Sequence, residues 1–271
     1  MGWLHLCLGS VSKFFLPNVK RMFKNILRIA VQEAFPPHTK GRPALLSFDG
    51  AYDDIVRVVR TGMQWRYLRP TAAVTYITVF KTMHKWVNAG LFRLAYERLL
   101  RLYRRRKRPR YCCVDSTFVK NVYGVDCVGR NPTDRGRMAT KLSAAVDDQG
   151  VPYSLLCTPG NQSDMRLLQP TLAAAIVPTP TGTPLYTDKG YDSTANQHMC
   201  TAYGYRDRIF RRRTSNSRRT HAKRGIVERF FSWMDKHRRL ILRYERYVDT
   251  YMAMTYLACG CLLAARMLLL A

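Results

Sequence analysis

The chain has 271 residues, which suffices for one good-sized domain with a small appendage and is too short for three independent hydrophobic cores. Its 47% hydrophobic and 23% charged residues are typical of a globular protein and exclude a disordered or collagen-like chain. The 45 Lys and Arg residues against 18 Asp and Glu give a net charge of +27, which indicates a polyanionic partner, above all nucleic acid, because these cations release counterions condensed on phosphates.

The first part of the chain predicts a basic arm and then a small helical domain. Residues 1–40 are basic and irregular in pattern, so we expect an arm. Residues 41–103 have helical periodicity, with Gly62 ending one helix and a second helical segment following Pro70. Short helices with exposed arginines favour a helix-turn-helix-like DNA-binding domain, although basic bundles without that role are also common.

The run RRRKRPR at 104–110 predicts an exposed basic linker, and the residue pattern beyond it favours β-strands. Three hairpinned strands are followed by alternating helices and strands and by two long closing helices. This order predicts an α/β catalytic domain over residues 111–271, with a mixed sheet flanked by helices. The expected strands cover 111–119, a segment around 121–128, 140–147, 151–160, 185–188 and 205–210.

The apolar segment from Tyr251 to the end has the length of a membrane span. Arg266 lies within it and no basic flank follows, which favours a buried core helix and no membrane partner. A tail-anchored membrane protein is kept as an alternative. The eight cysteines form no CxxC pair and no zinc-spaced cluster with histidine, so we expect free thiols in a reducing compartment.

Three acids stand in special places in this cationic chain. Asp115 lies inside an apolar strand, Asp188 closes another, and Glu228 lies at the edge of the apolar face of a helix. Taken singly, they have ordinary interpretations as a strand-end hydrogen-bonding group, a turn or cap residue, and a partner of Arg224. Taken together, two strand aspartates and a helix glutamate match what two divalent cations need in polynucleotidyl transfer.

Five blocks, in order, resemble one known family. The sequence is similar to DDE transposases of the insertion-sequence-five group from about Gly41 to the end of the chain. The blocks are RTGMQWRYL (60–68), VDSTFVK (114–120), KLSAAVDDQGVPYSLLCTPGNQSD (141–164), YTDKGYDS (186–193) and RGIVERFFSWMDKHRRLILRYER (224–246).

The resemblance implies a fold, an activity and a cofactor. The catalytic domain would be ribonuclease-H-like, with Asp115, Asp188 and Glu228 as catalytic residues that bind two Mg²⁺ ions, for which Mn²⁺ can substitute. The protein would bind the terminal inverted repeats of its own element in double-stranded DNA and catalyse cleavage and strand transfer. A homodimer or larger assembly is expected on DNA, in a bacterial cytoplasm (nucleoid) or in a nucleus. A catalytically inactive or domesticated DNA-binding derivative and a metal-dependent nuclease are the alternatives.

Other polar residues receive simpler roles. Asp147, Asp148, Asp164 and Asp192 are interpreted as turn residues or helix caps. A set of cations is expected to contact DNA phosphates, with solvent-facing charge as the alternative for each. This set is Arg66, Arg130, Lys141, Arg224, Arg229, Arg238 and Arg239.

Overall fold

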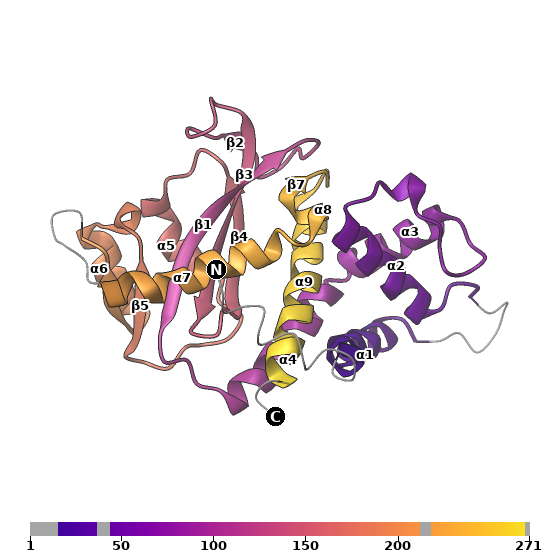
Figure 1. Ribbon diagram of the computed structural model, residues 1–271, viewed down its shortest axis with the longest axis horizontal. Coiled ribbons are helices and arrows are strands. Elements are labelled where there is room, and N and C mark those ends of the chain that lie inside the picture. Colours follow the sequence, from indigo (N-terminus) through magenta and orange to yellow (C-terminus); the bar gives the residue numbers. More distant parts are fainter. Residues whose placement is uncertain (1–15, 37–43, 212–217, 269–271) are drawn as a thin grey trace.

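Helices come first in the chain, and the first three α-helices lie to one side of a sheet, with the fourth and the last α-helix between the two regions (Figure 1). The computed structural model describes residues 16–36, 44–211 and 218–268. The helical elements before the sheet are α1 (Leu16–Ala34), α2 (Phe48–Thr61), η1 (Trp65–Tyr67), α3 (Tyr76–Asn88) and α4 (Leu91–Arg106). Buried side chains form one continuous apolar cluster from α1 to α9 (Val248–Leu268), so the two regions share a core.

The sheet combines an antiparallel half and a parallel half. Strand β3 pairs antiparallel with both β4 and β1, while β1 pairs parallel with β5, and β5 with β6. Three antiparallel strands followed by two parallel ones form the ribonuclease-H-like arrangement, so the predicted fold class is confirmed. The strands are β1 (Cys112–Asn121), β2 (Gly129–Arg130), β3 (Met138–Asp147), β4 (Pro152–Pro159), β5 (Thr183–Thr187), β6 (Tyr205–Ile209) and β7 (Leu242–Arg243).

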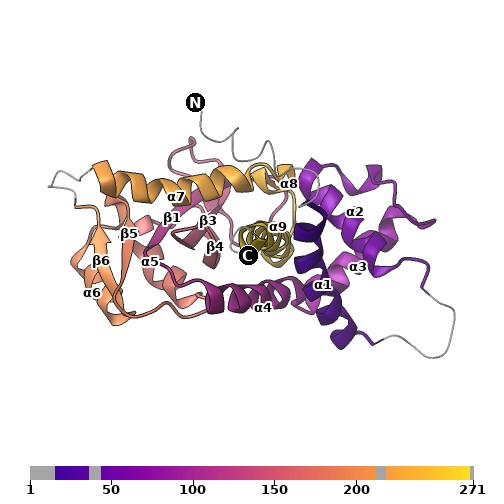
Figure 2. The ribbon, with the colours of Figure 1, turned by 60° about the horizontal axis from the view of Figure 1, so that its bottom comes forward.

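Helices cover both faces of this sheet (Figure 2). Helix α7 (Arg218–Met234) crosses one face, and α5 (Asp164–Ala173) lies on the other. Because side chains alternate along a strand, β1 directs Asp115 toward α7 and the next residue, Ser116, toward α5. The remaining elements are η2 (Lys189–Tyr191), α6 (Thr194–Ala202) and α8 (Arg238–Ile241).

Helix α9 accounts for the apolar end of the chain. It is long and apolar enough to cross a bilayer, but 72% of its most apolar stretch is buried inside the protein. Its side chains pack against α4, α1 and the sheet strand β4. The predicted core helix is therefore confirmed, with Arg266 in its last turn.

The expected irregular arm was wrong for residues 16–34, which form α1. Phe23, Leu27 and Ala30 lie on one face of this helix and are at most 1% exposed. Next to this face, Lys24 lies 2.9 Å from a carboxylate oxygen of Asp49 in α2. The basic residues suggested an arm because their acidic partners are distant in the sequence. Residues 1–15 and 37–40 of the expected arm lie outside the described residues.

The expected exposed linker at 104–110 was also wrong in part. Helix α4 continues to Arg106, and the side chain of Arg104 is only 11% exposed, 3.7 Å from the buried carboxylate of Asp147. Arg110 donates a 2.8 Å hydrogen bond to Asp148. The two aspartates lie at the turn between β3 and β4, as expected for turn residues, and each pairs with one arginine of this basic run.

Two further boundaries differ from the expectation. Residues 122–128 form a loop rather than a strand, because the backbone amides of Val122 and Val125 bond to carbonyl groups of the 243–246 segment instead of a neighbouring strand. The sequence predicts one helix over residues 224–240 around Glu228, but α7 ends at Met234 and the short α8 begins after a turn at 235–237.

Gly260 permits the close approach of α1 and α9. A Cβ atom at this position would lie within 2.6 Å of three ring atoms of the buried Phe23. Gly260→Ala should therefore lower the free energy of unfolding by about 1–3 kcal/mol, as overpacking does in a dense core. Urea denaturation measures this change. Adding Phe23→Leu to Gly260→Ala should recover part of the loss, and purely additive effects would contradict the contact.

Candidate active site

Two of the three singled-out acids lie side by side at the centre of the sheet. Asp115 is in β1, and Asp188 directly follows the neighbouring parallel strand β5. The register pairs Cys113 with Tyr186, so each aspartate lies two residues beyond a paired position. The parallel pairing therefore brings both carboxylates to the same level of the sheet, although they are far apart in the chain.

Glu228 joins them from α7, which crosses this face of the sheet (Figure 2). The three carboxylates all lie near the side chain of Arg224, which is one turn before Glu228 on the same helix. Its Nη1 atom is 3.2 Å from Oδ1 of Asp188. Its Nη2 atom is 3.6 Å from Oδ2 of Asp115 and 3.9 Å from Oε1 of Glu228. Three carboxylates from three elements thus surround one guanidinium group.

The solvent exposure of the three carboxylate side chains increases from Asp115 to Asp188 to Glu228. The side chain of Asp115 is 23% exposed, that of Asp188 47% and that of Glu228 63%. Burial raises the pKa of Asp115 to about 6, against the lowering effect of the Ser116 backbone N–H and of Arg224. One inner carboxylate therefore lies against the protein, and two outer ones face solvent.

When no divalent cation is present and the pH is above 6, Asp115→Asn should raise the free energy of unfolding of the protein. The folded-state pKa of about 6 exceeds the ordinary value of 3.8, so the folded chain binds this proton more tightly than the unfolded chain. Stability is therefore lost as the pH rises from about 4 to 6, by roughly 3 kcal/mol. The side-chain amide of the Asp115→Asn variant cannot ionise, so the variant does not lose this stability as the pH rises.

Urea denaturation in a chelator from pH 3.5 to 8 measures this difference. The variant and the wild type should coincide near pH 4, and the variant should be more stable by about 2–3 kcal/mol at pH 8. Parallel stability curves over the whole range would contradict the assignment.

The chemistry of this donor set fits a hard divalent cation, because all three groups offer carboxylate oxygens. Their spacing, however, is that of an ion-pair cluster. Of the side chains that the structure describes, no three from Asp, Glu, His or Cys stand at metal-coordination spacing. Arg224 stands among the three carboxylates instead. The site thus has the ligands for a metal, held around an internal cation.

Asp164, interpreted from the sequence only as a turn or cap residue, supports this site from the other face of β1. Ser116 Oγ donates a 2.6 Å hydrogen bond to Asp164, and Lys141 Nζ lies 2.7 Å from the same oxygen. A Cβ atom on Gly190, two residues after Asp188, would lie 3.5 Å from the Asp164 Cβ. Asp164 therefore ties the strand of Asp115 to the loop after Asp188. Its position at a helix start suggested only a cap, and no local pattern reveals the distant partners.

The structure separates the seven expected DNA-contacting cations into three groups. Lys141 is 4% exposed, in its ion pair with Asp164, and Arg239 is 7% exposed, with its Nε 2.7 Å from Glu245. These buried partners correct the expectation that both side chains are available at the surface. Arg224 points at the carboxylates. The exposed members are Arg66 in η1, Arg130 in β2, Arg229 in α7 and Arg238 at the start of α8.

Comparisons with known proteins cover the segment that builds this site. Residues 106–263 match the family model described as "Transposase DDE domain". Over 145 residues the chain is 35% identical to a Burkholderia cepacia protein named "Putative transposase for insertion sequence element IS402", a match that covers 51% of this chain and 68% of the relative. The family match includes Asp115, Asp188 and Glu228.

Proposed function

The chain belongs to the DDE transposase family, and we propose that it cuts DNA at the terminal inverted repeats of its own mobile element and joins the ends to a target. The observation that carries this proposal is the meeting of Asp115, Asp188 and Glu228 around one point on the sheet. Membership of the insertion-sequence-five group stays a prediction.

The three carboxylates have distinct structural supports in this proposal. Asp115 lies in β1, Asp188 directly follows the paired strand β5, and Glu228 lies on a helix packed on the same face, so each ligand comes from a different supported element. Divalent cations bound there would activate water or a 3′-hydroxyl and stabilise the leaving 3′-oxygen of an in-line displacement. Asp164 would support Asp115 through its hydrogen bond with Ser116 and lies close to Gly190 in the loop after Asp188.

DNA binding is proposed to use the exposed arginines on the face that carries α7. Arg229 follows Glu228 directly and is exposed. The net charge of +27 supports binding that is mainly electrostatic and therefore falls steeply with salt. Arg238 lies where α8 packs against the end of α2, so a duplex on this face would meet both the sheet region and the helical region.

Arg229→Ala should weaken DNA binding about equally for all sequences and should reduce the slope of log affinity against log salt by about 1, the value for one phosphate contact. Fluorescence anisotropy with a labelled duplex at 50–300 mM salt measures this slope. The matched control is Arg166→Ala, because Arg166 is exposed on α5, on the opposite face of the sheet. A slope change in the control alone would contradict the proposed face.

A joining assay tests the proposed activity against the alternatives. The protein is incubated with Mg²⁺, a labelled duplex that ends in the element's terminal repeat, and an unlabelled target plasmid. We expect nicks at the element's end and label joined covalently to the plasmid. Cutting without joined product would favour a metal-dependent nuclease, and binding without metal-dependent cutting would favour an inactive derivative.

A further inference from the structure

Arg224 stands where three negative charges converge. Each of the three carboxylates lies within 4.0 Å of its guanidinium group. Among the residues whose side chains the structure describes, no other cation lies within that distance of them. Without this side chain, the three carboxylates would face one another uncompensated, two of them partly exposed and one largely buried. Arg224 is therefore the internal counter-ion of the cluster.

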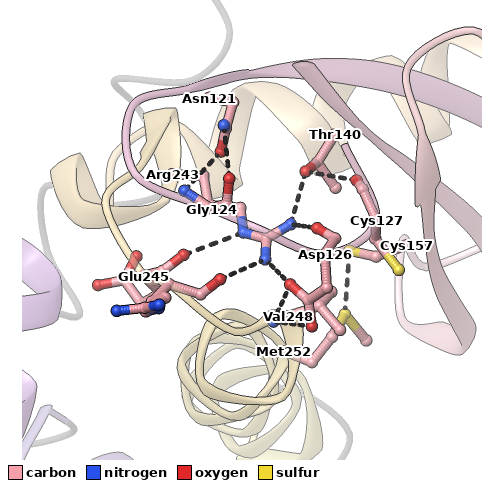
Figure 3. Close-up of polar contacts among 11 residues, drawn as sticks. Asn121, Gly124, Asp126, Cys127, Thr140, Cys157, Arg243, Glu245, Val248 and Met252 are labelled. Atoms are coloured by element: carbon pink, nitrogen blue, oxygen red, sulfur yellow. Dashed lines mark hydrogen bonds and ion pairs between the residues drawn. The ribbon is translucent and has the colours of Figure 1, made fainter. Parts of the chain in front are cut away.

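The chain contains buried arginines that are fixed by hydrogen bonds, and Arg224 differs from them. The guanidinium of Arg243 donates to Thr140 Oγ1 at 2.8 Å and to the Asp126 carbonyl at 2.6 Å, and it also pairs with the Asp126 carboxylate (Figure 3). Arg239 makes a 2.7 Å bond to Glu245. These distances are those of strong, directed hydrogen bonds.

The contacts of Arg224 are longer, at 3.2, 3.6 and 3.9 Å, and its buried Nε has no hydrogen-bond partner among the described residues. Its guanidinium carbon lies 5.2 Å from the centre of the Phe210 ring. The side chain is thus held by summed charge rather than by directed bonds. A stronger cation can replace a group that is held in this way.

We propose that Arg224 and divalent cations exchange at this site: the guanidinium assembles the three carboxylates when no metal is bound, and it withdraws when cations bind between them. This inference rests on the proposed function, since it takes the trio to be the metal ligands. A guanidinium and a divalent cation cannot share the space between the same oxygens, and their like charges repel. The side chain can withdraw by rotating about its own bonds, because it is long and leaves from the same helix as Glu228.

The exchange has a thermodynamic consequence that does not involve catalysis. If Arg224 competes with the metal, then removing its charge should tighten metal binding. The same change should destabilise the protein in a chelator, because the carboxylates lose their counter-ion. Added Mn²⁺ should restore this loss.

Calorimetric titration of Mn²⁺ into the full chain without DNA tests the exchange. We expect Arg224→Gln to bind Mn²⁺ at least tenfold more tightly than the wild type. Arg224→Lys should fall between them, because an ammonium is a single point charge without the fork of a guanidinium. The matched control, Arg229→Gln, removes the same charge from an exposed neighbour and should change affinity by less than threefold. Melting temperatures should show Arg224→Gln below the wild type in a chelator, with the gap closing at saturating Mn²⁺.

The outcomes separate this inference from the proposed function. If the wild type binds Mn²⁺ and Arg224→Gln binds it equally or more weakly, the exchange is overturned and the metal site stands. If Arg224→Gln gains no more than Arg229→Gln, only the net charge matters and the exchange is likewise overturned. If neither the wild type nor the variants show saturable Mn²⁺ binding, the proposed metal site falls together with the exchange.

Discussion

Replacing Arg243 with methionine should remove a large part of the stability of the protein. The side chain is completely buried and donates to the side chains of Asp126 and Thr140 and to the backbone carbonyl groups of Asp126, Glu245 and Arg246 (Figure 3). It thereby joins the 122–128 loop to β3 and to the segment before α9. Removing one partner of such a network leaves buried acceptors unpaired and costs about 3–5 kcal/mol, a large part of the stability of a typical domain.

Urea denaturation of Arg243→Met and the wild type measures this loss. Arg246→Met is the matched control, because Arg246 is exposed and three residues away, and it should change the free energy of unfolding by less than about 0.5 kcal/mol. Arg243→Lys should recover little, since an ammonium cannot reproduce the fork of donors. Equal stability of Arg243→Met and Arg246→Met would contradict the structural role.

Glu228→Gln should abolish metal-dependent cutting and leave DNA binding intact. The substitution keeps the size of a side chain that is 63% exposed, so the fold should not change. It removes one negative oxygen donor from the proposed metal site, where electrostatic stabilisation of the transition state amounts to several kcal/mol. The expected loss of rate is on the order of 10³-fold or more.

Single-turnover cutting of a labelled terminal-repeat duplex in Mg²⁺ measures this loss, and anisotropy measures binding in parallel. Glu97→Gln serves as the control, because Glu97 is a helical glutamate of α4 in an i,i+4 pair with Arg101. We expect the control to cut at the wild-type rate. Wild-type cutting by Glu228→Gln would remove this residue from the site.

Local patterns were sufficient to find the five longer strands (β1, β3, β4, β5 and β6) and the three acids. One aspartate lies inside the apolar strand at 112–121, and another directly follows the strand at 183–187. Each is unusual beside its apolar neighbours, so the sequence of its own segment is enough to single it out. The face of the helix that carries Glu228 is likewise a local property. Their convergence around Arg224 agrees with the hypothesis made from the sequence, while their roles in metal binding stay a prediction.

Distant partners could not be read from local patterns. Lys141 and Arg239 are residue types that usually lie at the surface. They are buried here because folding brings each to an acidic partner, Asp164 and Glu245 respectively. The same reason applies to α1, whose basic face is neutralised by acids of α2. In a chain with +27 net charge, a basic residue is a weak predictor of a surface position.

A change of metal preference tests the central claim, that the carboxylates act by holding divalent cations. Asp188→Cys replaces a hard oxygen ligand with a softer thiolate, which disfavours Mg²⁺ more than Mn²⁺. Cutting of the terminal-repeat duplex is compared in the two metals for the wild type, Asp188→Cys and Asp188→Ala. We predict that Asp188→Cys is inactive in Mg²⁺ and regains at least tenfold activity in Mn²⁺, whereas Asp188→Ala regains none. Equal cutting by all three proteins, or cutting that persists in a chelator, would contradict the account.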